Sequence, residues 1–148
     1  EAIQFTMSHD DGKKIDDLNA ADVVLLGVSR TSKTPTSIYL ANRGYKTVNI
    51  PLVLDQKIPA DLYSNNSSCI VGLIADPERL SDIRRNRVAI MQDQNLKEYT
   101  DLDSIKKEVE DSRKLFKKNS WPIIDVTRRS VEETAASILK IIEIKKNQ

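Results

Sequence analysis

The chain contains a single cysteine, Cys69, among its 148 residues. One cysteine can form neither an internal disulfide nor a cysteine-ligated zinc site, so a reducing compartment is the default expectation. The chain also lacks an excess of either charge, because 23 Lys and Arg stand against 22 Asp and Glu. A non-specific nucleic-acid binder usually has a basic excess. No apolar run approaches the roughly 18 residues of a membrane span, and no signal peptide is visible. We therefore expect a cytoplasmic protein that binds neither nucleic acid nor a membrane.

The length and the composition of the chain predict one compact domain over residues 1–148. Hydrophobic residues make up 39% and charged residues 30%, which is enough for a core and argues against disorder. The chain begins at Glu1 without a methionine and enters directly into a strand-like run. We therefore expect further sequence upstream.

Strand-like and helix-like segments alternate along the chain. The strands are expected at residues 2–7, 22–27, 46–50, 69–74 and 122–126. The helices are expected over 37–43, from 76 onward, over 101–118 and from 131 onward, where Ser130 and Glu133 match a capping box. This alternation predicts an α/β fold, a parallel sheet with flanking helices, in which ligands bind beyond the carboxyl ends of the strands.

The segment with the clearest chemistry is a polar loop between a buried strand and a helix. It consists of Gly27, Val28, Ser29, Arg30, Thr31, Ser32, Lys33 and Thr34. The loop fits the pattern G-x-x-x-x-G-K-[ST], except that Ser32 stands in place of the second glycine. Backbone N–H groups of such a loop cradle phosphate oxygens, and the helix N-terminus adds a favourable dipole. The segment predicts a P-loop-like nucleotide-binding core.

Serine at position 32 is a real departure, because the second glycine often takes a conformation that only glycine adopts cheaply. The plain alternative is a polar strand-to-helix turn with a serine or threonine N-cap. We favour phosphate binding because the strand, the spacing, the lysine and the threonine are all in place. Lys33 would then place its charge on the terminal phosphates, Arg30 would add a second cation, and Thr34 would be able to hold Mg²⁺.

From this loop onward the chain resembles a known family, the regulatory proteins of pyruvate, phosphate dikinase and of phosphoenolpyruvate synthase. The resemblance covers essentially the whole chain and rests on the blocks at residues 9–12, 27–44, 49–53, 76–80 and 121–127. The loop sequence from Ser29 to Thr34 looks more like the dikinase branch, in which Ser32 is the usual form. Members of the family are nearly twice this length, so the chain looks like the carboxy-terminal part of such a protein.

The resemblance implies a bifunctional enzyme, a serine/threonine kinase and phosphorylase. Such an enzyme uses ADP to phosphorylate a threonine near the catalytic histidine of the dikinase, and so inactivates it. It also removes that phosphate by attack of inorganic phosphate, which releases pyrophosphate and restores activity. Residues 27–34 match the family's ADP-binding loop residue for residue. The resemblance also implies a homodimer, and it admits the plastid stroma as the location if the source is a plant.

Phosphoryl transfer also needs a group that orients or deprotonates the acceptor hydroxyl. Asp10 and Asp11 follow the strand expected at residues 2–7, so we expect them beside the loop and assign them, with Lys33, to catalysis. An ordinary turn at Asp11-Gly12 is the alternative. We expect His9, the only histidine, to be a surface residue in that turn.

Two arginines are further candidates for holding an anion. Arg128 and Arg129 lie between a strand end and the capping-box helix, a position suited to inorganic phosphate or a phosphothreonine. Asp76 ends a buried strand, where a metal ligand is often found, but with Pro77 after it we favour a helix N-cap.

The remaining charged and reactive residues have plainer interpretations. Arg84, Arg85 and Arg87 are expected to form a solvated helix face or a docking surface for an acidic partner. Cys69, at the start of an apolar strand, is expected to be an inert core thiol.

Three alternatives to the dikinase kinase stay open. In the first, the target is phosphoenolpyruvate synthase and not the dikinase. In the second, the chain is a small-molecule kinase, because a phosphate loop alone does not determine its acceptor. The third is a non-catalytic module that binds ADP and docks a partner. Incubation with dikinase as the sole acceptor separates the kinases, and loss of both Asp10 and Asp11 tests whether transfer depends on those carboxylates.

Overall fold

A parallel sheet forms the centre of the chain. The computed structural model describes residues 2–9, 18–52, 62–63, 68–91 and 101–146. Within these residues four strands form one sheet, in the order β2-β1-β3-β4, and every neighbouring pair is parallel. The strands are β1 (Val23–Gly27), β2 (Thr47–Pro51), β3 (Cys69–Ile74) and β4 (Ile123–Asp125). The predicted α/β fold with a parallel sheet is confirmed.

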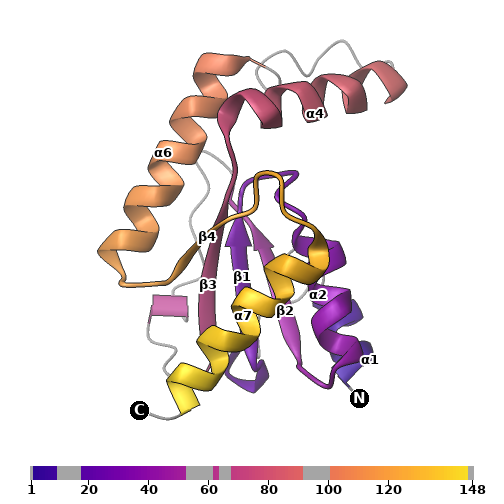
Figure 1. Cartoon of the computed structure of the whole chain (residues 1–148), viewed down its shortest axis with the longest axis vertical. Coiled ribbons are helices and arrows are strands. Elements are labelled where there is room, and N and C mark those ends of the chain that lie inside the picture. Colours follow the sequence, from indigo (N-terminus) through magenta and orange to yellow (C-terminus); the bar gives the residue numbers. More distant parts are fainter. Residues whose placement is uncertain (1, 10–17, 53–61, 64–67, 92–100, 147–148) are drawn as a thin grey trace.

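Helices cover the sheet on both faces (Figure 1). On one face α2 packs against α7, with α1 beside α2, and on the other α6 packs against β3 and against α4. The helices are α1 (Ala2–Ser8), α2 (Lys33–Asn42), α4 (Pro77–Met91), α6 (Leu102–Lys118) and α7 (Val131–Lys146), with a short 3-10 turn, η2 (Leu18–Ala20), before β1.

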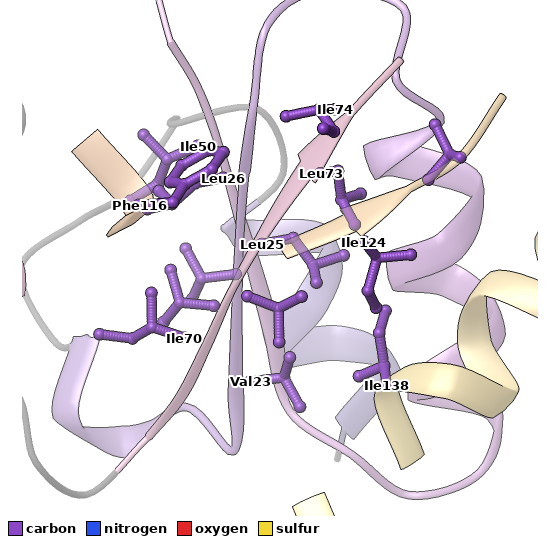
Figure 2. Packing of buried hydrophobic residues seen from close by; sticks show 14 of the residues in the cluster. Val23, Leu25, Leu26, Ile50, Ile70, Leu73, Ile74, Phe116, Ile124 and Ile138 are labelled. Carbon is purple, nitrogen blue, oxygen red and sulfur yellow. The ribbon is translucent and has the colours of Figure 1, made fainter. Parts of the chain in front are cut away.

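The core has two layers because successive side chains of a strand point to opposite faces of the sheet. Leu25 lies on the α7 face near Ile138, whereas Leu26 lies on the α6 face near Phe116 (Figure 2). All five residues of β1 are buried, which explains its continuous apolar sequence. The strand that leads into the predicted phosphate loop is therefore buried along its whole length, as β3 is.

The strand predicted at residues 2–7 is wrong, because this segment is the helix α1. A short apolar run does not distinguish a strand from a helix, and here the inward-facing residues follow helical spacing. Thr6 and His9 are buried, and Phe5 packs on the core, whereas Ile3 and Met7 are exposed. The Thr6 hydroxyl oxygen accepts a hydrogen bond of 3.0 Å from the backbone N–H of Thr47. The helix therefore packs at the amino end of β2.

Local capping predictions are confirmed. The Asp76 carboxylate accepts a hydrogen bond of 3.1 Å from the Arg79 N–H and so caps α4. Ser130 and Glu133 exchange the two hydrogen bonds of a capping box at the start of α7. Gly44 follows the end of α2 in the left-handed region, with φ of 91°.

The strand order creates a switch point at the carboxyl end of β1. The connection through α2 leads from β1 to β2 on one side, whereas β3 lies on the other side of β1. Connections that leave in opposite directions open a crevice beyond the strand ends, and ligands of such sheets bind there. The polar loop after Gly27 lies at this place.

Candidate phosphate-binding site

The loop begins at a glycine that the packing requires. A Cβ atom at Gly27 would lie 2.9 Å from the Leu73 carbonyl oxygen and 2.7 Å from the Thr31 hydroxyl. Both contacts are too short for real atoms, so only glycine lets the chain leave β1 this close to β3. The turn is therefore built against the centre of the sheet.

Two residues of the loop have left-handed backbone conformations. Arg30 has φ of 71°, and Ser32 has φ of 62° and ψ of 29°. Ser32 occupies the position of the second glycine and adopts the left-handed conformation for which glycine is usually needed there. A residue with a side chain adopts it at a cost of roughly 1–2 kcal/mol. Left-handed residues among right-handed ones turn backbone N–H groups toward one side, as anion-binding loops do.

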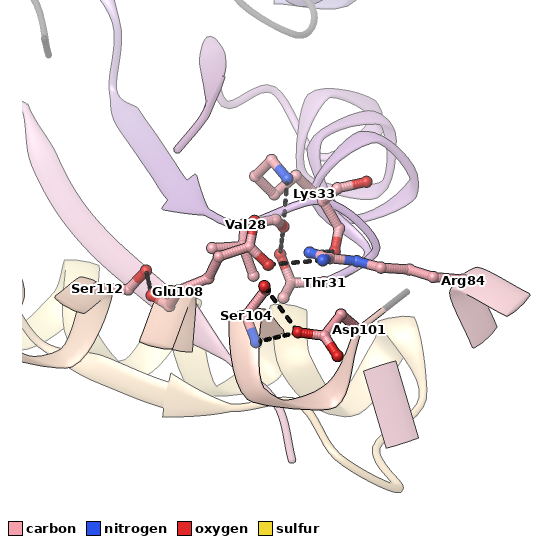
Figure 3. Close-up of polar contacts among 9 residues, drawn as sticks. Val28, Thr31, Lys33, Arg84, Asp101, Ser104, Glu108 and Ser112 are labelled. Carbon is pink, nitrogen blue, oxygen red and sulfur yellow. Dashed lines mark hydrogen bonds and ion pairs between the residues drawn. The ribbon is translucent and has the colours of Figure 1, made fainter. Parts of the chain in front are cut away.

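Lys33 folds back into the loop that precedes it. Its side chain is buried, and Nζ donates a hydrogen bond of 2.9 Å to the Val28 carbonyl oxygen (Figure 3). The Thr31 hydroxyl donates to the same oxygen at 2.8 Å. These bonds hold an ammonium group across the loop, at the first turn of α2, where the helix dipole also favours an anion.

A cavity of about 210 Å³ opens on this loop. Its lining consists of Ser29, Arg30, Ser32, Lys33, Thr34, Pro35 and Pro51. It is smaller than the roughly 300–1,000 Å³ of a site that encloses a whole small molecule. With two cationic side chains and a helix N-terminus, it suits a chain of phosphate groups. The structure thus brings five of the eight predicted loop residues together around it, whereas Gly27, Val28 and Thr31 are not among its lining residues.

Sequence reasoning missed the role of Arg84. The expectation of a solvated helix face is wrong for this residue, because its side chain is 0% exposed. Its guanidinium reaches Glu108 on α6 and the Ser29 carbonyl of the loop. The spacing between Leu80 and Arg84 could have indicated that Arg84 is buried, because residues four positions apart on a helix lie on the same face. Arg85 is exposed as expected, and the side chain of Arg87 lies outside the described residues.

Arg128 and Arg129 lie after β4 and are both exposed. Arg128, left-handed with φ of 60°, lines a second cavity of about 380 Å³ together with Asp76, Glu78, Arg79, Asp82 and Thr127. Arg129 donates a hydrogen bond of 3.1 Å to the Ser137 hydroxyl. Neither arginine is among the described residues that line the loop cavity. Their assignment to phosphate stays a prediction.

His9 is not a surface residue. It is 2% exposed, its ring stacks on Phe5 with centroids 3.9 Å apart, and Nδ1 lies 2.6 Å from the Phe5 carbonyl oxygen. Asp10 and Asp11 lie outside the described residues. The strand from which their place beside the loop was inferred is the helix α1, so that argument no longer applies to them.

Cys69 behaves as the sequence predicts for a core thiol. It is buried at the start of β3. Burial raises the pKa of the Cys69 thiol, and the charge of Lys145 only partly opposes this. The protonated thiol is a poor nucleophile, so the geometry gives no support to a catalytic cysteine.

The described residues contain neither a cluster of metal-ligating side chains nor a membrane-spanning helix. No group of three or more His, Cys, Asp or Glu side chains in the described part of the chain could hold a metal ion. Among the same residues, no helix has the length and apolar character needed to cross a membrane.

The chain is similar to proteins from several bacteria that carry the same name. The chain is 61% identical over 148 residues to a protein of Pelagibacter ubique, 56% over 142 residues to one of Rhizobium meliloti and 54% over 141 residues to one of Erythrobacter litoralis. Each is named "Putative pyruvate, phosphate dikinase regulatory protein". The matches cover 95–99% of this chain but 51–54% of the relatives, so the chain spans about half their length.

A family model described as kinase/pyrophosphorylase matches residues 1–139, nearly the whole chain. The sequence resemblance to dikinase regulators is thereby confirmed, and the chain belongs to the kinase/pyrophosphorylase family.

Proposed function

We propose that this chain carries the ADP site of a bifunctional protein kinase and phosphorylase that controls pyruvate, phosphate dikinase. The observation that carries the proposal is the buried Lys33 ammonium, held 2.9 Å from the Val28 carbonyl inside a loop with two left-handed residues. Family membership and the names of the relatives support the target. The reaction would take place in the cytoplasm.

In the kinase direction, the β-phosphoryl group of ADP would pass to a threonine hydroxyl of the dikinase, and AMP would leave. The small cavity would hold the phosphates, while the nucleoside would lie outside it. Lys33 and Arg30 would stabilise the charge on the transferring group. Asp10 and Asp11 remain our candidates for accepting the threonine proton.

In the phosphorylase direction, inorganic phosphate would attack the phosphothreonine. An oxygen of the phosphate would form the new bond to phosphorus, the bond to the threonine oxygen would break, and pyrophosphate would leave. The same cations suit this step because both directions transfer one phosphoryl group between oxygen atoms. Arg128 and Arg129 remain candidates for holding the incoming phosphate.

Thr34 fits a magnesium ion that arrives with the nucleotide. Mg²⁺ in such sites keeps several waters and binds mainly the substrate phosphates, and Thr34, which lines the cavity, would supply one protein oxygen. When bound, the ion would neutralise charge on the phosphate oxygens.

Calorimetric titration of this chain with ADP is the first test, with ATP for comparison. We expect saturable binding of ADP that is lost in Lys33→Ala. Lys140→Ala is a matched control, since Lys140 is an exposed lysine on α7. No ADP binding by the folded chain, or equal binding by Lys33→Ala, would contradict the loop assignment.

The second test concerns the chemistry. Dikinase is incubated with the protein and ADP, and its mass and phosphothreonine content are measured. We expect the mass to rise by one phosphoryl group, and later addition of phosphate to release pyrophosphate. Binding of ADP without any transfer would favour the non-catalytic module, and transfer to phosphoenolpyruvate synthase alone would change the target.

A further inference from the structure

Arg84 has an unusual position for a charged side chain. Among the described residues it is the largest side chain that the fold buries completely. It projects from the middle of α4, on the same face as Leu80. Burial of a guanidinium is costly unless its hydrogen bonds are made, and here both terminal nitrogens, Nη1 and Nη2, have protein acceptors.

The guanidinium bridges two other parts of the chain (Figure 3). Nη1 lies 2.6 Å from Glu108 Oε2 on α6, and Nη2 donates a hydrogen bond of 3.1 Å to the carbonyl oxygen of Ser29 in the loop. Glu108 is 18% exposed, so the ion pair is largely shielded from water. The planar guanidinium of arginine has donors in a fixed fork, so it can bind both acceptors at once, and a lysine ammonium does this less well.

The bond to Ser29 fixes the orientation of a peptide group in the loop. In a planar trans peptide the carbonyl of one residue and the N–H of the next point in opposite directions. Because the Ser29 carbonyl accepts its hydrogen bond from Arg84, the N–H of Arg30 points away from the Arg84 guanidinium. Both residues line the loop cavity. The contact therefore presents a backbone donor for an anion.

We propose that Arg84, anchored by Glu108, is a positioning residue that holds the Ser29–Arg30 peptide in the orientation that binds phosphate. This inference rests on the proposed function only in naming the ligand, the phosphate groups of ADP. Arg84 itself touches the back of the loop, so it acts through that peptide. It also ties α4 and α6 to the loop, which gives these helices a direct connection to the site.

The first experiment tests the orientation without any nucleotide. Hydrogen–deuterium exchange is measured on the free protein for Arg84→Lys, which keeps the charge and loses the fork. We expect faster exchange at the amides of residues 28–32 and unchanged exchange in β1 and β3. The matched control is Arg85→Lys, the exposed neighbour on the same helix. Unchanged exchange in the loop overturns the inference, whatever ADP does.

The second experiment measures affinity for ADP and for pyrophosphate, which has phosphate groups and no nucleoside. We expect Arg84→Lys to weaken both by the same factor, roughly tenfold, as for a typical coupling between a site and its support. Glu108→Gln should weaken both in the same direction, with exposed Glu110→Gln as its control. Unchanged affinity for both ligands overturns the inference.

Ile142→Val is the control for a general loss of stability. It changes a buried residue on α7, away from the loop, and should lower stability alone. It should leave loop exchange and pyrophosphate affinity unchanged. Should Arg84→Lys not fold, Glu108→Gln tests the same contact from α6. If the wild-type protein binds neither ligand, the proposed function fails, while loop exchange still decides the role of Arg84.

Discussion

The ring of Phe116, on α6, lies directly over Gly72 of β3. A Cβ atom at position 72 would be 2.3 Å from Phe116 Cδ2, so the aromatic ring occupies the space that any side chain would need. Both residues lie in the buried layer between the sheet and α6. The close approach of helix and strand depends on this pair.

Gly72→Ala should therefore destabilise the protein by about 1–3 kcal/mol, the usual cost of forcing extra volume into a packed core. The free energy of unfolding is measured by urea denaturation. Gly72→Ala/Phe116→Leu should recover part of the loss, because the smaller side chain makes room. Additive losses in this double-mutant cycle would show that the two positions do not compete for space.

The left-handed conformation of Ser32 predicts that glycine is favoured there. Ser32→Gly should raise the free energy of unfolding by up to about 1 kcal/mol, because relief of backbone strain outweighs the greater freedom of the unfolded chain. Ser120→Gly is the matched control, since Ser120 has φ of 56° outside the loop. Both should gain stability, and ADP affinity should be unaffected by Ser120→Gly. A loss of stability in Ser32→Gly would show that the serine side chain stabilises the loop.

The N-cap of α6 provides a prediction for a single side chain. The Asp101 carboxylate accepts hydrogen bonds from the backbone N–H and the hydroxyl of Ser104. Asp101→Ala should cost about 1 kcal/mol in thermal or urea unfolding, as other N-cap losses do. Asp103→Ala, at an exposed position two residues later in the first turn of α6, should cost less. Equal losses in the two variants would show that Asp101 stabilises α6 only through its charge near the helix terminus, and not through its hydrogen bonds.

The buried thiol predicts slow chemistry and a direction of pH dependence. Because the pKa of Cys69 is raised in the folded state, the unfolded chain loses this proton at lower pH than the folded chain. The contribution of Cys69 to stability therefore falls as pH rises above the ordinary thiol pKa. Iodoacetamide should react slowly with the folded protein and quickly in urea, as followed by mass spectrometry. Fast reaction of the folded protein near neutral pH would contradict the burial.

Local sequence patterns predicted the features that depend on few neighbours. The Asp76 cap and the capping box of Ser130 each follow from residues within one helical turn. The predicted strand at residues 2–7 was wrong because a short apolar run does not distinguish a strand from a helix, and the contact of Thr6 with Thr47, 41 positions away, is not visible in the local pattern.

Arg84 shows the same limit at the candidate site. Its partners Glu108 and Ser29 are 24 and 55 positions away, and only the fold brings them to one place. Next to Arg85 and Arg87 it reads as part of a charged surface. The position of the polar loop between β1 and α2 was therefore predictable, whereas the contact of Arg84 behind it was not.

The central place of β1 affects how a ligand would be received. Its five residues are buried and bonded to β2 on one side and β3 on the other, so the backbone that enters the loop is already ordered before anything binds. Ordering a flexible segment costs roughly 1–2 kcal/mol for each residue fixed. A loop whose base is already held avoids much of that cost, which leaves more of the contact energy for affinity. The sheet would thus preorganise the base of the loop for the anion that we propose it binds.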